Sequence, residues 1–185
     1  MKMETEIGKT QEKYWITDTK ALVGGVFFGI VFTIVCVLAD VVDAVLDPSL
    51  ALLGGTVWAI FTAIIAMIYG QPAGIIGGAM QALISMATGM SPLGFFFIFA
   101  NCIGSIVYIS LARSLNMNKS GNYVITQFVT SLVGFFFVGI GTMVVYSLPF
   151  NVALACALIG VVVTTIVAPP ITKRIVNKIK KSGLT

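Results

Sequence analysis

The chain consists of long apolar runs separated by short polar turns. No Asp, Glu, Lys or Arg occurs in residues 48–112 or 120–172. About 20 consecutive apolar residues are needed for an α-helix to cross the hydrocarbon core of a bilayer. The pattern predicts an all-α integral membrane protein with six transmembrane helices in one bundle, at residues 21–39, 50–68, 73–88, 93–112, 124–148 and 152–168.

Residues typical of turns separate these runs. Gln71 and Pro72 predict a tight turn between spans two and three, because proline lacks an N–H and fits the first turn of a helix. Residues 90–94 and 147–151 predict the turns that follow spans three and five. The first 20 residues are polar and mixed in charge, so no cleavable signal peptide is expected.

The basic residues predict the orientation in the membrane. All of them lie before span one, between spans four and five, or after span six: Lys2, Lys9, Lys13, Lys20, Arg113, Lys119, Lys173, Arg174, Lys178, Lys180 and Lys181. An even number of spans puts these three groups on one side, which the positive-inside rule makes cytoplasmic. Both termini are therefore predicted to be cytoplasmic. The bases are scattered over terminal segments, so no nucleic-acid partner is expected.

Three segments follow from this topology. Residues 1–20 form an N-terminal cytoplasmic or interfacial segment, in which Tyr14 and Trp15 are expected to anchor at the membrane interface. Residues 21–170 form the membrane domain. Residues 171–185 form a basic tail that is expected to contact anionic membrane lipid.

The residue inventory argues against an enzyme. The chain has no His, and each of its three Cys residues lies in a different predicted span, so neither a metal site nor a disulfide is expected. It contains no phosphate-binding Gly-Lys-Ser/Thr loop, and no Ser–His pair or pair of buried Asp residues for intramembrane proteolysis. We expect no catalytic residues and no cofactor.

Ionisable residues inside the predicted spans are equally scarce. Proton-coupled carriers need such groups inside the bilayer. The only candidate is Asp40 at the outer end of span one, which we interpret as a hydrated loop acid beside Asp43 and Asp47. If the protein moves a solute, its energy is therefore expected to come from a partner; a Na⁺ site built of carbonyls and hydroxyls stays open.

Small residues recur at four-residue spacing on two predicted spans. They are Ala21, Gly25 and Gly29 on span one, and Gly74, Gly78 and Ala82 on span three. This spacing makes a groove on one helix face, in which a second helix backbone can approach closely. Packing within the chain and docking of a partner protein both explain it, and spacing alone favours packing within the chain.

Polar side chains inside the spans are the third pattern. In the predicted orientation the outer halves hold Trp58, Gln81, Ser85, Thr88, Asn101, Thr142, Tyr146 and Asn151. Buried amides need partners, which are other helices, water or a solute. Polar residues also occur in the inner halves, so the asymmetry is partial. The pattern predicts either interhelical hydrogen bonds or an outward-facing pocket for a small neutral or weakly charged solute.

Taken together, these features resemble a known family. The chain looks like the substrate-binding S components of energy-coupling factor (ECF) transporters, nearest the hydroxymethylpyrimidine/thiamine branch, the YkoE type. The likeness covers residues 55–112 and rests on Trp58, Gln71-Pro72-Ala73-Gly74, Ala82-Leu83, Gly89-Met90, Asn101 and Gly104-Ser105.

The resemblance implies a multi-pass subunit in the plasma membrane of a prokaryote. Such a subunit binds a vitamin or vitamin precursor on the outer side, with a thiamine- or hydroxymethylpyrimidine-like solute favoured. It also implies a transmembrane T component and two ATPase subunits as partners, with Ala21, Gly25 and Gly29 docking on the T component. The branch carries acidic residues in spans three and four, where this chain has Gly78 or Ala79 and Ile106. A neutral solute therefore fits as well as a cation such as thiamine.

Two alternatives remain open. A structural or assembly subunit of a membrane complex would need the same small-residue faces but no pocket. A small self-sufficient facilitator would need a polar line through the membrane, which the spans do not readily provide.

Overall fold

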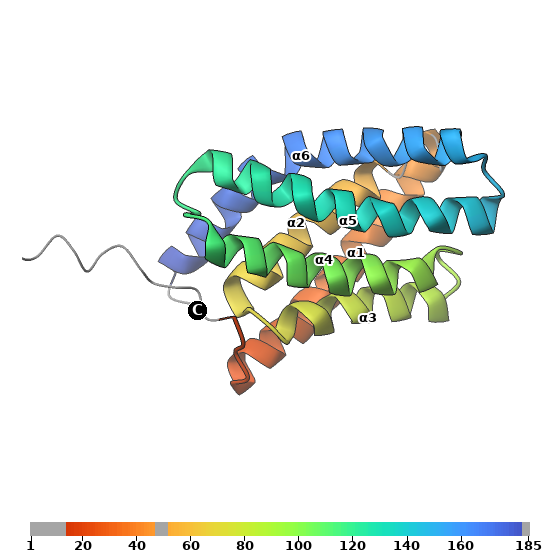
Figure 1. The fold of residues 1–185 in the computed structure, drawn as a ribbon. Coiled ribbons are helices and arrows are strands. Elements are labelled where there is room, and N and C mark those ends of the chain that lie inside the picture. The colour runs from red at the N-terminus through yellow and green to blue at the C-terminus, as the bar shows by residue number, and fades with distance from the viewer. Residues whose placement is uncertain (1–13, 47–51, 183–185) are drawn as a thin grey trace, which may run out of the picture.

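The computed structural model describes residues 14–46 and 52–182, and these residues form a bundle of helices (Figure 1). The helices are α1 (Thr19–Leu46), α2 (Leu52–Tyr69), α3 (Ala73–Ala87), α4 (Gly94–Ser114), α5 (Ser120–Tyr146) and α6 (Phe150–Lys181). Four of the six predicted spans agree with these helices to within a few residues, and α1 and α6 extend well beyond their predicted ends.

Helix α2 is the central element of the bundle. It contacts each of the other five helices, while α1, α3, α4, α5 and α6 follow one another around it. Within the described part of the chain, α1 and α6 do not meet, and α2 lies between them. Accordingly, 56% of the most apolar stretch of α2 is buried, against 33% of that of α1. A helix that is apolar on all sides is stable in the centre of a bundle.

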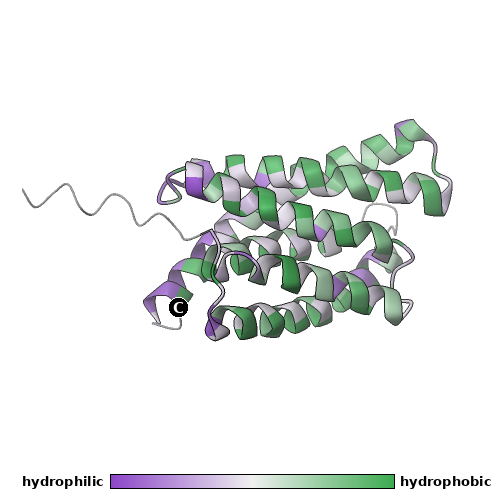
Figure 2. Ribbon diagram, turned by 60° about the horizontal axis from the view of Figure 1, so that its bottom comes forward, coloured by the Kyte–Doolittle hydropathy of each residue, from purple (hydrophilic) through white to green (hydrophobic). Residues whose placement is uncertain are grey.

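The outside of the bundle is apolar, as expected for a protein surrounded by lipid. Five described helices are long and apolar enough to cross a membrane, while α3, with 15 residues, is shorter. Hydrophobic residues cover the helices along most of their length (Figure 2). Large side chains such as Phe27 and Leu38 on α1 are 59% and 63% exposed. These long apolar helices fit a multi-pass membrane protein, with five of the six predicted spans long enough to cross.

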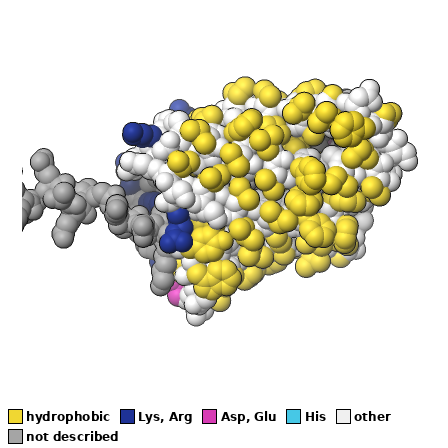
Figure 3. Space-filling view, in the orientation of Figure 1, with side chains coloured by type: hydrophobic (Ala, Val, Ile, Leu, Met, Phe, Trp, Pro, Cys, Tyr) yellow, Lys and Arg dark blue, Asp and Glu magenta, His cyan; other side chains and the backbone are white. Residues whose placement is uncertain are grey.

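Among the described residues, positive charge is confined to the end of the bundle at which the described chain begins and ends (Figures 1 and 3). The Lys and Arg side chains visible in Figure 3 gather there, and the apolar side chains cover the remainder of that face. Asp40 lies 20 residues after Lys20 on α1, so the helix rise places it roughly 30 Å away, near the opposite end.

The sequence predicts that span one ends at residue 39 and that a hydrated loop follows. Instead, α1 continues to Leu46 and carries Asp40 and Asp43 with it. Asp43 is buried, and its two carboxylate oxygens accept hydrogen bonds from the backbone N–H groups of Leu53 and Gly54, at 3.0 and 2.7 Å. It satisfies donors that the first turn of α2 leaves free. The interpretation of this acid as a hydrated loop residue is wrong; Asp47 lies outside the described residues.

Helix α6 also runs further than its predicted span. It passes through Pro169 and Pro170 and ends at Lys181, where the sequence predicts a tail after residue 170. Thr172 and Val176 are fully buried in this extension, and Val176 belongs to the apolar cluster that includes Tyr108. Packing against the bundle therefore keeps the segment helical despite the two prolines.

The small-residue face of α1 packs against α3. A Cβ added to Gly25 would lie 2.8 Å from the Cβ of Ala73, and one added to Gly29 would lie 2.9 Å from the Cα of Gly77. Ala21, Gly25 and Gly29 are all buried. The prediction that these three residues form a docking surface for a partner is therefore wrong, and close packing within the chain, the alternative interpretation, is correct.

The turn between α2 and α3 is tied to the segment that precedes α1. The backbone N–H of Gln71 donates to the carbonyl of Tyr14 at 2.7 Å, and the N–H of Ile16 donates to the carbonyl of Gln71. The Gln71 amide nitrogen also donates to Ser105 on α4 at 2.8 Å. Pro72 is the N-cap residue of α3, one position before the first turn in which the sequence predicts it.

Candidate functional site

Two buried amides from neighbouring helices form the polar centre of the site. Gln81 on α3 and Asn101 on α4 are 3% and 2% exposed. The Asn101 Nδ2 donates to Gln81 Oε1 at 2.7 Å and to the carbonyl of Gly78 at 2.8 Å, while the Gln81 Nε2 donates to Ser85 at 3.1 Å. Gly78 allows this contact, because a Cβ there would lie 2.9 Å from that of Asn101. One amide therefore positions the other.

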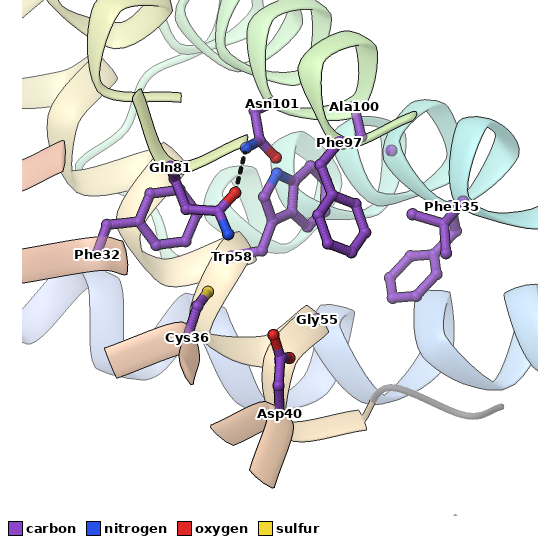
Figure 4. Close-up of a pocket in the computed structure, with 13 residues that line it drawn as sticks. Phe32, Cys36, Asp40, Gly55, Trp58, Gln81, Phe97, Ala100, Asn101 and Phe135 are labelled. Atoms are coloured by element: carbon purple, nitrogen blue, oxygen red, sulfur yellow. Dashed lines mark hydrogen bonds between the residues drawn. The ribbon is translucent and has the colours of Figure 1, made fainter. Parts of the chain in front are cut away.

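Trp58 lies beside this pair with its indole N–H free. The residue is 8% exposed, and its Nε1 has no hydrogen-bond partner. Its benzene edge is held where Gly104 and Gly134 leave space, since a Cβ on Gly104 would lie 2.9 Å from Trp58 Cζ2. Most buried indole N–H groups have a partner. The glycines fix the ring, and the nitrogen lies on the edge that faces Asn101 (Figure 4).

These side chains line a partly open pocket between five helices (Figure 4). The cavity that they enclose measures about 50 Å³ and is partly open to the outside. Ligand pockets for small molecules are mostly apolar with a few polar groups. The lining residues are Phe32, Cys36, Asp40, Gly54, Gly55, Trp58, Gln81, Phe97, Ala100, Asn101, Gly134, Phe135 and Val138.

Asp40 is the one charged side chain in this lining. It is half-buried, and Gly54 on α2 makes room for it, because a Cβ there would collide with Asp40 Oδ1. Asp43, on the same helix, uses both of its oxygens at the start of α2. The carboxylate of Asp40 thus belongs to the pocket, and its interpretation as a hydrated loop acid is wrong.

The pocket walls are aromatic. Trp58 and Phe135 meet edge to face, with ring centroids 6.1 Å apart and planes at 85°. Phe32, which also lines the pocket, stacks on Phe61, with ring centroids 5.3 Å apart. Edge-to-face and offset-stacked pairs are favourable arrangements that hold both rings in place. The apolar walls are therefore rigid, which suits them to recognise a ligand of fixed shape.

The structure brings together half of the residues predicted to bind a solute. Trp58, Gln81 and Asn101 line one pocket, and the Ser85 hydroxyl accepts a hydrogen bond from the Gln81 amide. The other predicted residues lie elsewhere: Thr88, Thr142, Tyr146 and Asn151. The Thr88 hydroxyl donates to the carbonyl of Ile84 at the end of α3.

The remaining three predicted residues lie near the turn between α5 and α6. Thr142 lines a separate small pocket between these helices, and its hydroxyl donates to the carbonyl of Gly139 at 2.8 Å. Tyr146 and Asn151 are exposed. None of the three is among the residues that line the pocket with Gln81, although Tyr146 lies within electrostatic range of the pocket residue Asp40.

The sequence contains one signal for the pocket residues that the prediction leaves out. Phe32, Cys36 and Asp40 are spaced by four residues, which puts them on one face of a helix if span one continues past residue 39. Phe97, Phe135 and the glycines carry no such signal, because an apolar residue facing a pocket looks like one facing lipid.

Comparisons with protein-family models, with characterised proteins and with solved structures found no match to this chain.

Proposed function

We propose that this protein is the membrane-embedded substrate-binding subunit of an ECF-type importer for a vitamin or vitamin precursor. In this proposal the chain crosses the membrane six times, both termini are cytoplasmic, and the pocket opens toward the outside. A thiamine- or hydroxymethylpyrimidine-like solute is favoured by the sequence resemblance alone.

The observation that carries the proposal is the polar pocket in an apolar bundle. Polar side chains in the interior of membrane proteins are costly, and they mark solute pathways and binding sites. The Gln81–Asn101 pair and the unpartnered indole of Trp58 meet at one cavity. An assembly subunit without a ligand has no need for a buried N–H that lacks a partner.

Energy comes from partner proteins in this proposal. The sequence has no phosphate-binding loop of its own, so a T component and two ATPase subunits drive the transport step. The T component contacts a surface other than Ala21, Gly25 and Gly29, because α3 covers that face.

Reconstitution in liposomes tests the proposal. We expect liposomes that hold this chain with its T component and ATPases to accumulate radiolabelled thiamine or hydroxymethylpyrimidine only when ATP is supplied. The matched control contains this chain alone, for which we expect binding without accumulation. ATP-independent flux through the chain alone would establish a facilitator. Full transport by the other subunits in the absence of this chain would exclude it as the substrate-binding subunit and favour the assembly role.

A further inference from the structure

The pocket combines a carboxylate with aromatic walls, and none of the described residues that line it is positively charged. Among the described residues, Asp40 is the only charged group in its lining, and four aromatic side chains surround the same space: Phe32, Trp58, Phe97 and Phe135. Aromatic faces attract cations through their quadrupole, and tryptophan does so most strongly. A carboxylate and several aromatic rings together are the chemistry that recognises an organic cation.

The part of the chain that the structure describes offers Asp40 no positive partner. No Lys or Arg occurs between Lys20 and Arg113 or between Lys119 and Lys173, so both long stretches that build the pocket lack a base. Lys20 begins the same helix, roughly 30 Å from Asp40. A buried charge that has no partner is unfavourable. A bound cation would give the Asp40 carboxylate the positive partner that the described residues do not supply.

Trp58 supplies the second, independent sign of a ligand. Its Nε1 is buried, has no hydrogen-bond partner, and lies on the ring edge that faces Asn101 (Figure 4). A ligand with an acceptor atom at this point would satisfy the N–H. The pocket thus has an anionic wall formed by Asp40 on α1, and a hydrogen-bond donor on α2 at its polar centre.

We propose that the pocket selects a small, flat organic cation that carries a hydrogen-bond acceptor. Its charge pairs with Asp40 and lies against the aromatic walls, and its acceptor atom receives the Trp58 N–H. This inference rests on the proposed solute-binding function and adds the charge of the solute, which the sequence leaves open between neutral and cationic.

A pair of probes of equal shape tests the charge directly. 1-Methylnicotinamide is a flat cation with a carboxamide acceptor, and 3-methylbenzamide is its neutral counterpart, with carbon in place of the charged nitrogen. Both are titrated calorimetrically into the full chain in nanodiscs of uncharged phosphatidylcholine. We expect the cation to bind at least tenfold more tightly than the neutral probe. Equal or tighter binding of the neutral probe, or no binding of the cation at millimolar concentration, would overturn the inference.

Two variants assign the effect to Asp40. Asp40→Asn is expected to lower the affinity for the cation at least tenfold and to change the affinity for the neutral probe less than twofold. Asp18→Asn is the matched control: it removes a negative charge from the other end of α1, where Asp18 caps the helix through the N–H of Ala21, and asparagine caps equally well. It should change neither affinity. Unchanged binding of the cation to Asp40→Asn would overturn the inference.

The outcomes separate this inference from the proposed function. A neutral molecule that binds tightly in the pocket would overturn selection of a cation and leave solute binding in place. The comparison of the two probes on the unaltered chain needs no variant, so the test stands even if Asp40→Asn fails to fold.

Discussion

The contact between α1 and α3 gives a prediction whose magnitude follows from the structure. A Cβ on Gly29 would lie 2.9 Å from the Cα of Gly77, whereas carbon atoms pack best at about 3.5–4.0 Å. Gly29→Ala therefore requires the two helices to separate by roughly 0.6–1.1 Å. The atom in the way belongs to the backbone and cannot rotate aside. Overpacking of this kind costs about 1–3 kcal/mol of stability.

Gly139→Ala is the matched control, because this glycine also lies inside a helix. A Cβ there would make an ordinary 3.7 Å contact with the Cβ of Ala157. Both substitutions gain about the same helix propensity, about 1 kcal/mol, so their difference isolates the overpacking. At about 2–4 °C per kcal/mol for a chain of this size, Gly29→Ala should melt about 2–12 °C below Gly139→Ala.

Thermal unfolding of the two purified variants in one detergent measures this difference, followed by the intrinsic fluorescence of the chain. Equal melting temperatures, or a higher one for Gly29→Ala, would refute the close α1–α3 contact. The face of Ala21, Gly25 and Gly29 would then be available to a partner after all.

Three further predictions concern single side chains. Asp43→Ala should lower the free energy of unfolding by about 1–3 kcal/mol, because two N–H groups of α2 lose a charged acceptor; an unchanged melting temperature would contradict this cap. Thr130→Val should leave stability unchanged or raise it by about 1 kcal/mol, since the Thr130 hydroxyl is buried without a partner. A clear drop in the melting temperature of this variant would show that the hydroxyl has a hydrogen-bond partner. Asn101→Leu should reduce solute affinity at least tenfold in calorimetry, because it removes the amide that holds Gln81; unchanged affinity would place the solute elsewhere.

Most of the helical framework could be predicted from the apolar runs, because lipid demands about 20 apolar residues for each span. The ends of α1 and α6 could not. Asp43 looks like a loop residue until its contact with the start of α2 is known, and Pro169 looks like a helix end until the burial of Val176 is known. In both cases a tertiary contact outweighs the local signal.

The role of the small-residue faces depended on information that spacing does not hold. A groove lined by Gly25 and Gly29 looks the same whether the helix that fills it belongs to the chain or to a partner. The structure fills it with α3.

The polar part of the candidate site could be predicted from the sequence. Gln81 and Asn101 are conspicuous in apolar spans, and the structure joins them by a hydrogen bond. The aromatic walls were not predictable, because phenylalanine is common on every face of a membrane helix. Asp40 was visible in the sequence, but the predicted end of span one placed it outside the pocket.

The central claim is that the pocket formed by Trp58, Gln81, Asn101 and Asp40 holds a solute. Native mass spectrometry of the gently purified full chain tests it most directly. The claim predicts one bound molecule of vitamin size per chain, and its loss in Asn101→Leu at an unchanged melting temperature. A chain without any adduct, even after incubation with thiamine and its pyrimidine precursor, or an adduct that Asn101→Leu retains in full, would contradict it.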